Sequence, residues 1–487
     1  MDEIIRTVRS RNATVDEMMS SVLTLDGHID HEIQKLSGNN EFPLLSGRED
    51  LISFCEDYLA ERLGADAAER ASAVLQKGIL YTANHLGGLY SAQSFQGDLI
   101  YARLLGKLFG GAAPSVPMMS FGLVPINSST YARGLIAYSR TDGAEHIPLL
   151  PKMPTNAAAS LSDAFTSAMA RSTKDKALAN VRSYLVKKQI RSVMESLYQS
   201  PQVLGCRRFA DQVIYLGEGL YDRLYGVILQ GKFWHMEAET VFAGLFEKDF
   251  GDHGSLVYHI LSDEAAITAL NEATDDEGRK LSSLLFRGCA SDRKCFGINL
   301  DADGHLRGRD ISGGCLDIDI RSDGGSALTD AVKARKVMPH VYLSWFMSSY
   351  VRGFSWYGGI LQSQYLRGWR RSTCEMLRDA GYADAVGPRG DFDDSGYLSG
   401  PIYMLFDTGD GAVNAGPFEM MAKPPAPEAF DRLFGETDMK SAHEMGCFEF
   451  YNDITDADEK GDNWYERIAV YAKEHYGKYT LQNLQGC

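Results

Sequence analysis

The sequence predicts an α/β protein with a parallel sheet at its core. A short apolar run at residues 78–82 is followed by a polar, glycine-containing loop, by a helical pattern and by a second apolar run at 116–121. Strand, loop, helix and strand in this order form a βαβ unit, from which parallel doubly wound sheets are built. Hydrophobic residues make up 44% and charged residues 23% of the 487 residues, as in a globular protein large enough for two or three lobes.

Apolar spacing and turn residues predict the elements of the first third. Leu51, Cys55, Tyr58 and Leu59 recur at helical intervals, and Gly64 provides a helix stop. The expected elements are, in chain order, a mostly helical segment over 1–75, a strand at 78–82, a helix capped by Ser91 or Ser94 that ends near residue 110, and strands at 116–121 and 134–138.

The rest of the chain alternates between helical and strand-like patterns. The expected elements are helices over 162–200, mainly helices over 205–285, strands within 295–320 around a turn at 301–304, helix over 337–377, and loops with short strands over 385–420. The apolar stretch 341–361 is the one candidate for a membrane span. It contains Arg352, several glycines and several hydroxyl groups, which hydrocarbon penalises, so a buried helix is the better interpretation.

The net charge and the cysteine pattern argue against several classes of protein. The formal net charge is −16 with a pI near 5.2, and no run of Lys and Arg forms the basic stripe that nucleic-acid binding requires. The first residues carry no apolar stretch of signal-peptide length. The eight cysteines form no CxxC motif, which fits free thiols in a reducing compartment. We therefore expect a cytoplasmic protein that binds neither nucleic acid nor membrane.

Polar residues gather where the strand 78–82 passes into the following helix. Free N–H groups and the helix dipole attract a carboxylate or phosphate at such a point, and glycines let a ligand approach the backbone. A neutral imidazole there can act as a general base. The candidate catalytic residues are His85 and Asp98, and the candidate substrate-binding residues are Asn84, Gly87, Gly88, Gln93, Ser94 and Gln96. The alternative is a turn whose side chains only cap the helix; the loop is neither GxGxxG nor a Walker A loop.

A second polar loop, over 125–134, follows the next strand. Adjacent parallel strands end on the same side of a sheet, so both loops can border one crevice. Asn127, Tyr131 and Arg133 are its candidate ligand contacts, with Arg133 suited to a carboxylate or phosphate through its planar fork. A structural salt bridge is the alternative role for Arg133.

A third polar and aromatic stretch spans residues 352–365. Its glycine pair at 358–359 opens a helix, where backbone N–H groups can face a ligand. Arg352, Gln362 and Tyr365 are the candidate contacts, whereas an aromatic-rich helix with small residues is also typical of a close-packed core.

The sequence contains only weak matches to known metal-binding motifs and none to a GxSxG nucleophile motif. Residues 299–310 resemble a calcium loop in spacing, but strand-like neighbours favour a hairpin turn. His28 and His31 have no third ligand for zinc, and no GxSxG motif occurs. We assign no metal site, and the sequence requires no cofactor and identifies none.

The chain resembles the bacillithiol synthase family, the cysteine-adding enzymes that complete a low-molecular-weight thiol. The family's Thr-Gly-Gln-Gln-x-Gly and Gly-Pro-Leu-Tyr motifs have counterparts in residues 82–87 and 88–90, and its Gly-Gly-Pro-x-Glu-x-x-Tyr motif in residues 358–365. The family's acidic Glu-Asp-His-Asp segment is replaced here by residues 120–127, and its C-terminal coiled coil has no evident equivalent. The resemblance implies a Rossmann-like core with helical insertions and a site where the two stretches meet. It does not imply cysteine ligation.

From these observations we expect a Rossmann-like parallel sheet core with a largely helical insertion. The expected parts are 1–160, a helical entry segment and the first half of the core; 161–330, a mainly helical inserted lobe with a β-hairpin; and 331–487, the second half of the core and a C-terminal extension. The expected function is formation of a C–N or C–S bond on an amino-acid-like, polar or anionic small molecule, including ring closure with loss of an anionic group. A non-catalytic ligand-binding or partner-stabilising protein is the alternative, a nucleotidyl transferase is a third reading, and a protein partner or homo-oligomer stays open.

Overall fold

The computed structural model describes residues 1–39, 47–87, 91–111, 115–124, 126, 133–152, 157–224, 231–290, 294–310 and 312–485. The strands are β1 (Ile79–Tyr81), β2 (Val116–Ser120), β3 (Gly134–Ala137), β4 (Glu145–Pro148), β5 (Phe233–Glu237), β6 (Phe286–Cys289), β7 (Cys295–Leu300), β8 (His305–Arg309), β9 (Cys315–Asp319), β10 (Val337–Pro339), β11 (Ser355–Gly359), β12 (Ser395–Ser399), β13 (Leu405–Asp407) and β14 (Ala412–Asn414).

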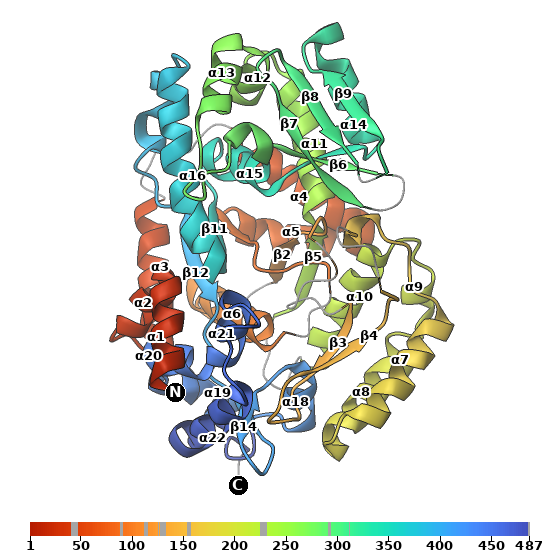
Figure 1. Ribbon diagram of the computed structural model, residues 1–487, viewed down its shortest axis with the longest axis vertical. Helices are drawn as coiled ribbons and strands as arrows, with labels where there is room; N and C mark the ends of the chain where they lie inside the picture. Colours follow the sequence, from red (N-terminus) through yellow and green to blue (C-terminus); the bar gives the residue numbers. More distant parts are fainter. Residues whose placement is uncertain are drawn as a thin grey trace.

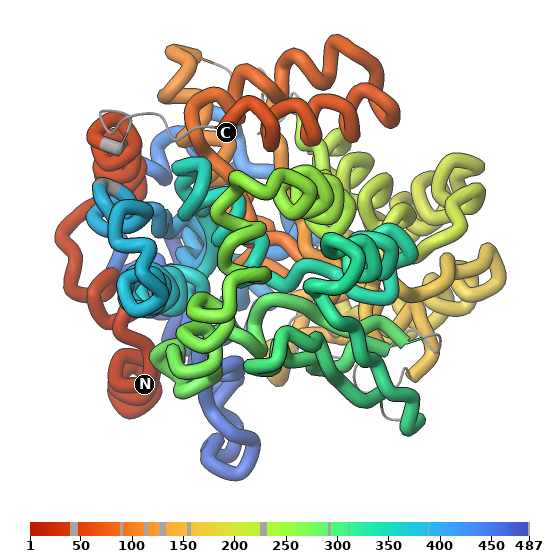
Figure 2. The backbone as a smooth tube through the Cα atoms, turned by 90° about the horizontal axis from the view of Figure 1, so that it is seen from above, coloured from red at the N-terminus to blue at the C-terminus, as the bar shows by residue number. Residues whose placement is uncertain are grey.

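Helices lie to the left and to the right of the central strands in the view of Figure 1. The α-helices are α1 (Asp2–Arg11), α2 (Ala13–Ser20), α3 (Leu25–Asn39), α4 (Arg48–Leu63), α5 (Ala65–Leu75), α6 (Ala92–Leu108), α7 (Ser167–Asn180), α8 (Tyr184–Ser196), α9 (Pro201–Leu204), α10 (Phe209–Asp222), α11 (Ala238–Gly251), α12 (Leu256–Ser262), α13 (Glu264–Glu272), α14 (Ser326–Lys333), α15 (Val341–Trp345), α16 (Ile360–Asp379), α17 (Ala383–Val386), α18 (Pro417–Ala422), α19 (Pro427–Glu436), α20 (Met439–Met445), α21 (Cys447–Ile454) and α22 (Trp464–Tyr476). Figure 2 shows α4 and α5, which pack on each other, along one edge of the molecule.

Five short parallel strands lie at the centre. β1, β11 and β12 form one parallel sheet, and β2 pairs with β5 in another. A bridge between His85 and Phe121 joins them, because Phe121 N–H donates to the Asn84 carbonyl at 3.0 Å and Leu86 N–H donates to the Phe121 carbonyl at 2.8 Å. The strand order is therefore β5-β2-β1-β11-β12. The predicted mixed α/β class with parallel strands is confirmed, as are a strand within 78–82 and the helix that Ser91 caps.

The middle third does not stand apart from this core. Its strand β5 pairs in register with β2, so that Ser120 lies opposite Glu237. The expectation of a sheet made only from the first and last thirds is wrong on this point. Residues 205–285 read as mainly helical because β5 is five residues long and lies between two helices, α10 and α11, so helical spacing dominates the pattern around it.

A second, antiparallel sheet of order β10-β6-β7-β8-β9 lies beyond the parallel strands, at the top of Figure 1. The expected turn at 301–304 connects β7 to β8, and Gly304 there has a left-handed φ of 83° that a residue with a side chain would rarely adopt. The predicted hairpin is thus confirmed within a larger sheet. Strand β3, in contrast, pairs antiparallel with β4 and does not continue the parallel core.

Residues 341–361 do not form the single buried helix that was expected. They form α15, a π-helical turn at Phe346–Tyr350 and strand β11. Gly353, with φ 69°, ends the helical part, and its carbonyl accepts a hydrogen bond from the Arg48 guanidinium at 2.6 Å. Across the described ranges, no helix combines the length and apolar character needed to cross a membrane.

Candidate active site at the carboxyl ends of the parallel strands

Two buried carboxyl groups lie where β2 and β5 end. Glu237 is the last residue of β5, and Glu239 is the second residue of α11, which follows β5 directly. Both side chains are buried, Glu237 completely. The carboxyl ends of parallel strands are where α/β sheets bind ligands.

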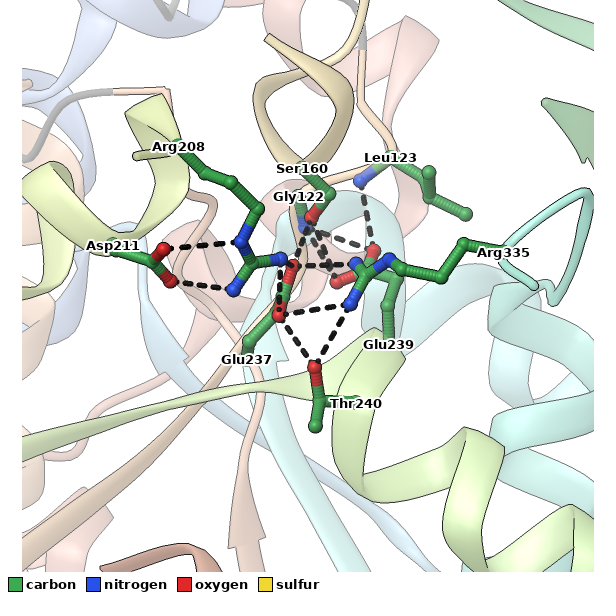
Figure 3. A network of polar contacts seen from close by, with 9 residues as sticks. All are labelled: Gly122, Leu123, Ser160, Arg208, Asp211, Glu237, Glu239, Thr240 and Arg335. Carbon is green, nitrogen blue, oxygen red and sulfur yellow. Dashed lines mark hydrogen bonds and ion pairs between the residues drawn. The ribbon is translucent and has the colours of Figure 1, made fainter. Parts of the chain in front are cut away.

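The Glu239 carboxylate occupies a pair of backbone N–H groups at the end of β2. Gly122 N–H donates to both of its oxygens, at 2.8 and 3.0 Å, and Leu123 N–H donates at 2.8 Å (Figure 3). Position 122 must be glycine, because a Cβ there would lie 2.1 Å from the Ser160 hydroxyl. Two convergent backbone donors form an anion-binding concavity.

The Glu237 carboxylate lies between two arginines. Arg208 donates to both of its oxygens at 2.9 Å, and Arg335 donates to Oε1 at 2.8 Å. The hydroxyls of Ser160, at 2.7 Å, and Thr240 donate as well. Ser160 also lies 3.5 Å from Glu239, so its hydroxyl connects the two carboxyl groups (Figure 3).

This arrangement separates the pKa values of the two acids. Burial raises the pKa of Glu239 to about 7, and the negative charge of Glu237 contributes in the same direction. Burial opposes ionisation of Glu237 too, but the guanidinium groups of Arg335 and Arg208 outweigh it and lower the pKa of Glu237 to about 2. One carboxyl is therefore ionised at neutral pH, and its neighbour exchanges a proton there.

The two arginines connect the buried pair with solvent. The Arg208 and Arg335 side chains are 34% and 31% exposed. Asp211 fixes Arg208 from the outer side. The backbone of Arg335 has a left-handed φ of 52°, a conformation that residues other than glycine rarely adopt. The Nε atom of Arg335 is buried without a hydrogen-bond partner among the described residues. Strained backbone of this kind is concentrated at functional sites.

His85 lies at the border of this cluster. Its backbone pairs with Phe121, and the next residue, Gly122, donates to Glu239. Burial lowers the pKa of His85 to about 4, so the imidazole is neutral at pH 7, as expected, but is a weak base.

Asp98 is sealed in the core rather than open to a substrate. The Asn84 amide donates to it at 2.9 Å and the Tyr221 hydroxyl donates to its other oxygen. Burial raises the pKa of Asp98 to about 7. Asp98 was predicted to be catalytic and Asn84 to bind the ligand, but the two side chains bond to each other in the interior of the protein.

The start of α6, predicted to hold an anionic ligand, holds a carboxylate of the protein itself. Gln93 N–H donates to Glu449 at 2.9 Å, and the Tyr138 hydroxyl donates to it at 2.6 Å. Tyr138 in turn accepts from Ala92 N–H at 3.0 Å, and Ser94 N–H is directed at the capping Ser91 hydroxyl. The anion at this helix start is therefore Glu449 of α21, which no local pattern placed there.

Gln96 and Arg352 hold the structure together. The Gln96 amide donates to the carbonyls of Met404 and Ala415 and accepts from the N–H groups of Tyr403 and Met404, all within 3.0 Å. Arg352 is buried in an ion pair with Asp249. The predicted substrate contacts of both residues are replaced by internal bonds.

The remaining predicted substrate-binding residues do not lie together. Gln362 exchanges hydrogen bonds of 2.8 and 3.0 Å with Thr82 at the end of β1, where the two predicted stretches lie side by side as β1 and β11. Tyr365, one helical turn further along α16, lines a separate cavity. Gly87 is buried in the turn after Leu86. Gly88, Asn127 and Tyr131 lie outside the described residues.

Arg133 follows the second polar loop and is half-buried. Its backbone has a left-handed φ of 54°, and its carbonyl accepts from Leu149 and Leu150. Its Nη1 is buried without a hydrogen-bond partner in the part of the chain that the structure describes. The salt bridge considered as the alternative role of Arg133 is not found among the described residues.

The sequence carried one signal for the carboxyl pair that was overlooked. The run Phe233–Glu237 ends in an acid, and a second acid, Glu239, follows after one residue. Ser160, Arg208 and Arg335 come from distant segments and follow no common motif. Among the described residues, no three His, Cys, Asp or Glu side chains are placed to hold a metal ion.

No protein-family model matches the chain. No curated protein matches it in a sequence comparison.

Proposed function

We propose that this chain is a small-molecule enzyme that forms a C–N or C–S bond on an amino-acid-like substrate, with its site at the Glu237–Glu239 pair. One observation carries the proposal: two buried carboxyls share Ser160, one ionised between arginines and one with a pKa raised to about 7. Burying such groups is costly, and well-packed apolar residues would stabilise a fold at least as well. Buried acids with separated pKa values favour acid–base chemistry.

In the proposed reaction, the ionised Glu239 accepts the proton of an attacking amine or thiol. The nitrogen or sulfur forms a bond to an electrophilic carbon, and the bond from that carbon to an anionic leaving group breaks, with the electron pair going to the leaving group. Arg208 and Arg335 hold the anionic part of the substrate or the leaving group, since guanidinium suits carboxylate and phosphate. Ring closure follows the same scheme when amine and leaving group belong to one molecule. Glu239 takes the role first given to His85, because its pKa matches neutral pH better.

We also propose a more specific fold type for the parallel core. Numbered along the chain, the parallel strands have the spatial order 3-2-1-4-5, which is the order of a Rossmann-like doubly wound sheet. We propose that the core is of this type, with the antiparallel sheet and its helices added to it.

A turnover assay tests the function. The wild-type chain is incubated with paired pools of amino acids and phosphorylated or carboxylated electrophiles, and products are detected by mass spectrometry. We expect a product whose formation falls at least a hundredfold in Glu239→Gln. Glu247→Gln, on the solvent side of the same helix near Lys333, serves as the matched control and keeps full turnover. Binding of a pool member without conversion by either protein would instead support the binding-protein alternative.

A further inference from the structure

A separate cavity of about 680 Å³ is lined in part by α16, and Gln362 is not among its lining residues. Residues of α2, of the turn after α13, of the start of α15 and of α16 line it. Its volume is that of a small-molecule site. The proposed reaction at Glu237 and Glu239 makes no use of it.

The inner wall of the cavity is aromatic and contains an unpaired donor. Tyr365 and Trp369 both line it, and their rings lie 4.4 Å apart between centroids. Trp369 is only 3% exposed, yet its indole Nε1 has no hydrogen-bond partner in the described part of the chain. Tyr342 packs edge-on against the same indole and fixes it. A buried N–H without an acceptor destabilises the protein, so a molecule that supplies the acceptor is favoured.

The rim of the cavity is acidic. Four carboxylates line it, from Glu17, Asp275, Asp276 and Glu277, against two guanidinium groups, from Arg279 and Arg367. Arg279 pairs with Asp275 and Glu277. Arg367 pairs with Glu17, and Asp276 pairs with Arg371. Four carboxylates against three guanidinium groups leave one negative charge, which favours a cation, and aromatic faces attract cations as well.

We propose that this cavity binds a planar aromatic amine, with its ring against Tyr365 and Trp369, an acceptor atom on the ring opposite Trp369 Nε1 and its ammonium group at the acidic rim. The site is independent of the Glu237–Glu239 chemistry and takes a cation, whereas that site takes an anion.

Calorimetric titration of the full chain with three matched probes tests whether binding requires both the aromatic ring and the positive charge of the ligand. Tyramine carries the ring and the ammonium group, p-cresol carries the ring alone, and 4-hydroxyphenylacetate carries a carboxylate instead. We expect tyramine to bind at least tenfold more tightly than either of the others. Equal binding of the three, or preference for the carboxylate, would overturn the proposal.

Two variants locate the binding. Trp369→Phe keeps an aromatic ring and removes the donor, and we expect tyramine affinity to fall about tenfold. Leu361 lies at the mouth with 58% exposure, so Leu361→Trp narrows the cavity without changing the core and should abolish binding even if the first variant folds poorly. Trp464→Phe, in α22, is the control and should bind as the wild type does. Unchanged affinity in Leu361→Trp would contradict the assignment.

Discussion

The carboxylate of Glu449 accepts a hydrogen bond of 2.9 Å from the backbone N–H of Gln93, at the first turn of α6. The helix dipole and the free N–H groups at this point attract an anion, and the C-terminal part of the chain supplies it. This contact ties α21 to the helix that follows β1, and thereby ties a C-terminal helix to the parallel core.

We expect Glu449→Ala to destabilise the protein by about 2–4 kcal/mol, because the Gln93 N–H and the Tyr138 hydroxyl lose their buried partner. Urea unfolding measures the loss, and faster amide exchange at Gln93 shows where it arises. Glu466→Gln, at an exposed position of α22, should leave the midpoint unchanged. A wild-type midpoint in Glu449→Ala would mean that the carboxylate does not cap α6.

Substitution of Gln96 tests whether this residue stabilises the fold or binds a ligand. Its amide satisfies buried backbone groups of three residues, so Gln96→Leu should cost about 3–5 kcal/mol in the free energy of unfolding. The same replacement at the exposed Gln202 of α9 should change it by less than about 0.5 kcal/mol. If Gln96→Leu keeps wild-type stability and loses only ligand affinity, the residue belongs to a binding site after all.

The pKa of Glu239 makes stability depend on pH in a defined window. Because its folded-state pKa of about 7 exceeds the ordinary value of 4.5, the folded protein keeps a proton that the unfolded chain loses within this interval. Its contribution to stability is complete below pH 4.5 and is lost as the pH rises to 7. The wild type should therefore lose stability relative to Glu239→Gln by about 1.4 kcal/mol per pH unit across the window. Chemical unfolding at several pH values measures the difference, and the Glu247→Gln control should show none.

Arg335 combines an ion pair with an unfavourable backbone conformation, and two substitutions separate these effects. Arg335→Ala leaves buried Glu237 with one guanidinium and should cost about 3 kcal/mol. Arg335→Gly loses the same pair but relieves the left-handed backbone, so it should be about 1 kcal/mol more stable than the alanine variant. Thermal unfolding compares them, with Lys333→Ala as an exposed control. Equal stability of the two variants would mean that the left-handed backbone at residue 335 is not strained.

The sequence predicted those features of the fold that local patterns determine. The apolar run at β1, the Ser91 cap and the turn before β8 each depend on a few neighbouring residues, and each is present. Strand β5 was missed because helical periodicity surrounds five residues, and the stretch containing β11 was assigned to a helix because a strand buried on both faces is as apolar as a buried helix.

The candidate site was predicted less well, for a different reason. The location at the carboxyl ends of parallel strands follows from topology, and Gln362 does meet Thr82 there. Which anion fills a helix start is decided by tertiary contacts, and Glu449 is more than 350 residues away from Gln93 along the chain. Arg208 and Arg335 converge on Glu237 in the same way, from segments with no common spacing.

Direct observation of the Glu239 carboxyl group as it titrates decides whether Glu237 and Glu239 form an acid–base pair at neutral pH. Protein labelled with ¹³C at the glutamate carboxyl carbon, with the Glu239 resonance identified by its loss in Glu239→Gln, reports this one group as the pH is varied from 4 to 9. We expect a titration midpoint near 7, far above the ordinary glutamate value of 4.5. A resonance that has the shift of an ionised carboxylate over the whole range above pH 5 would contradict it.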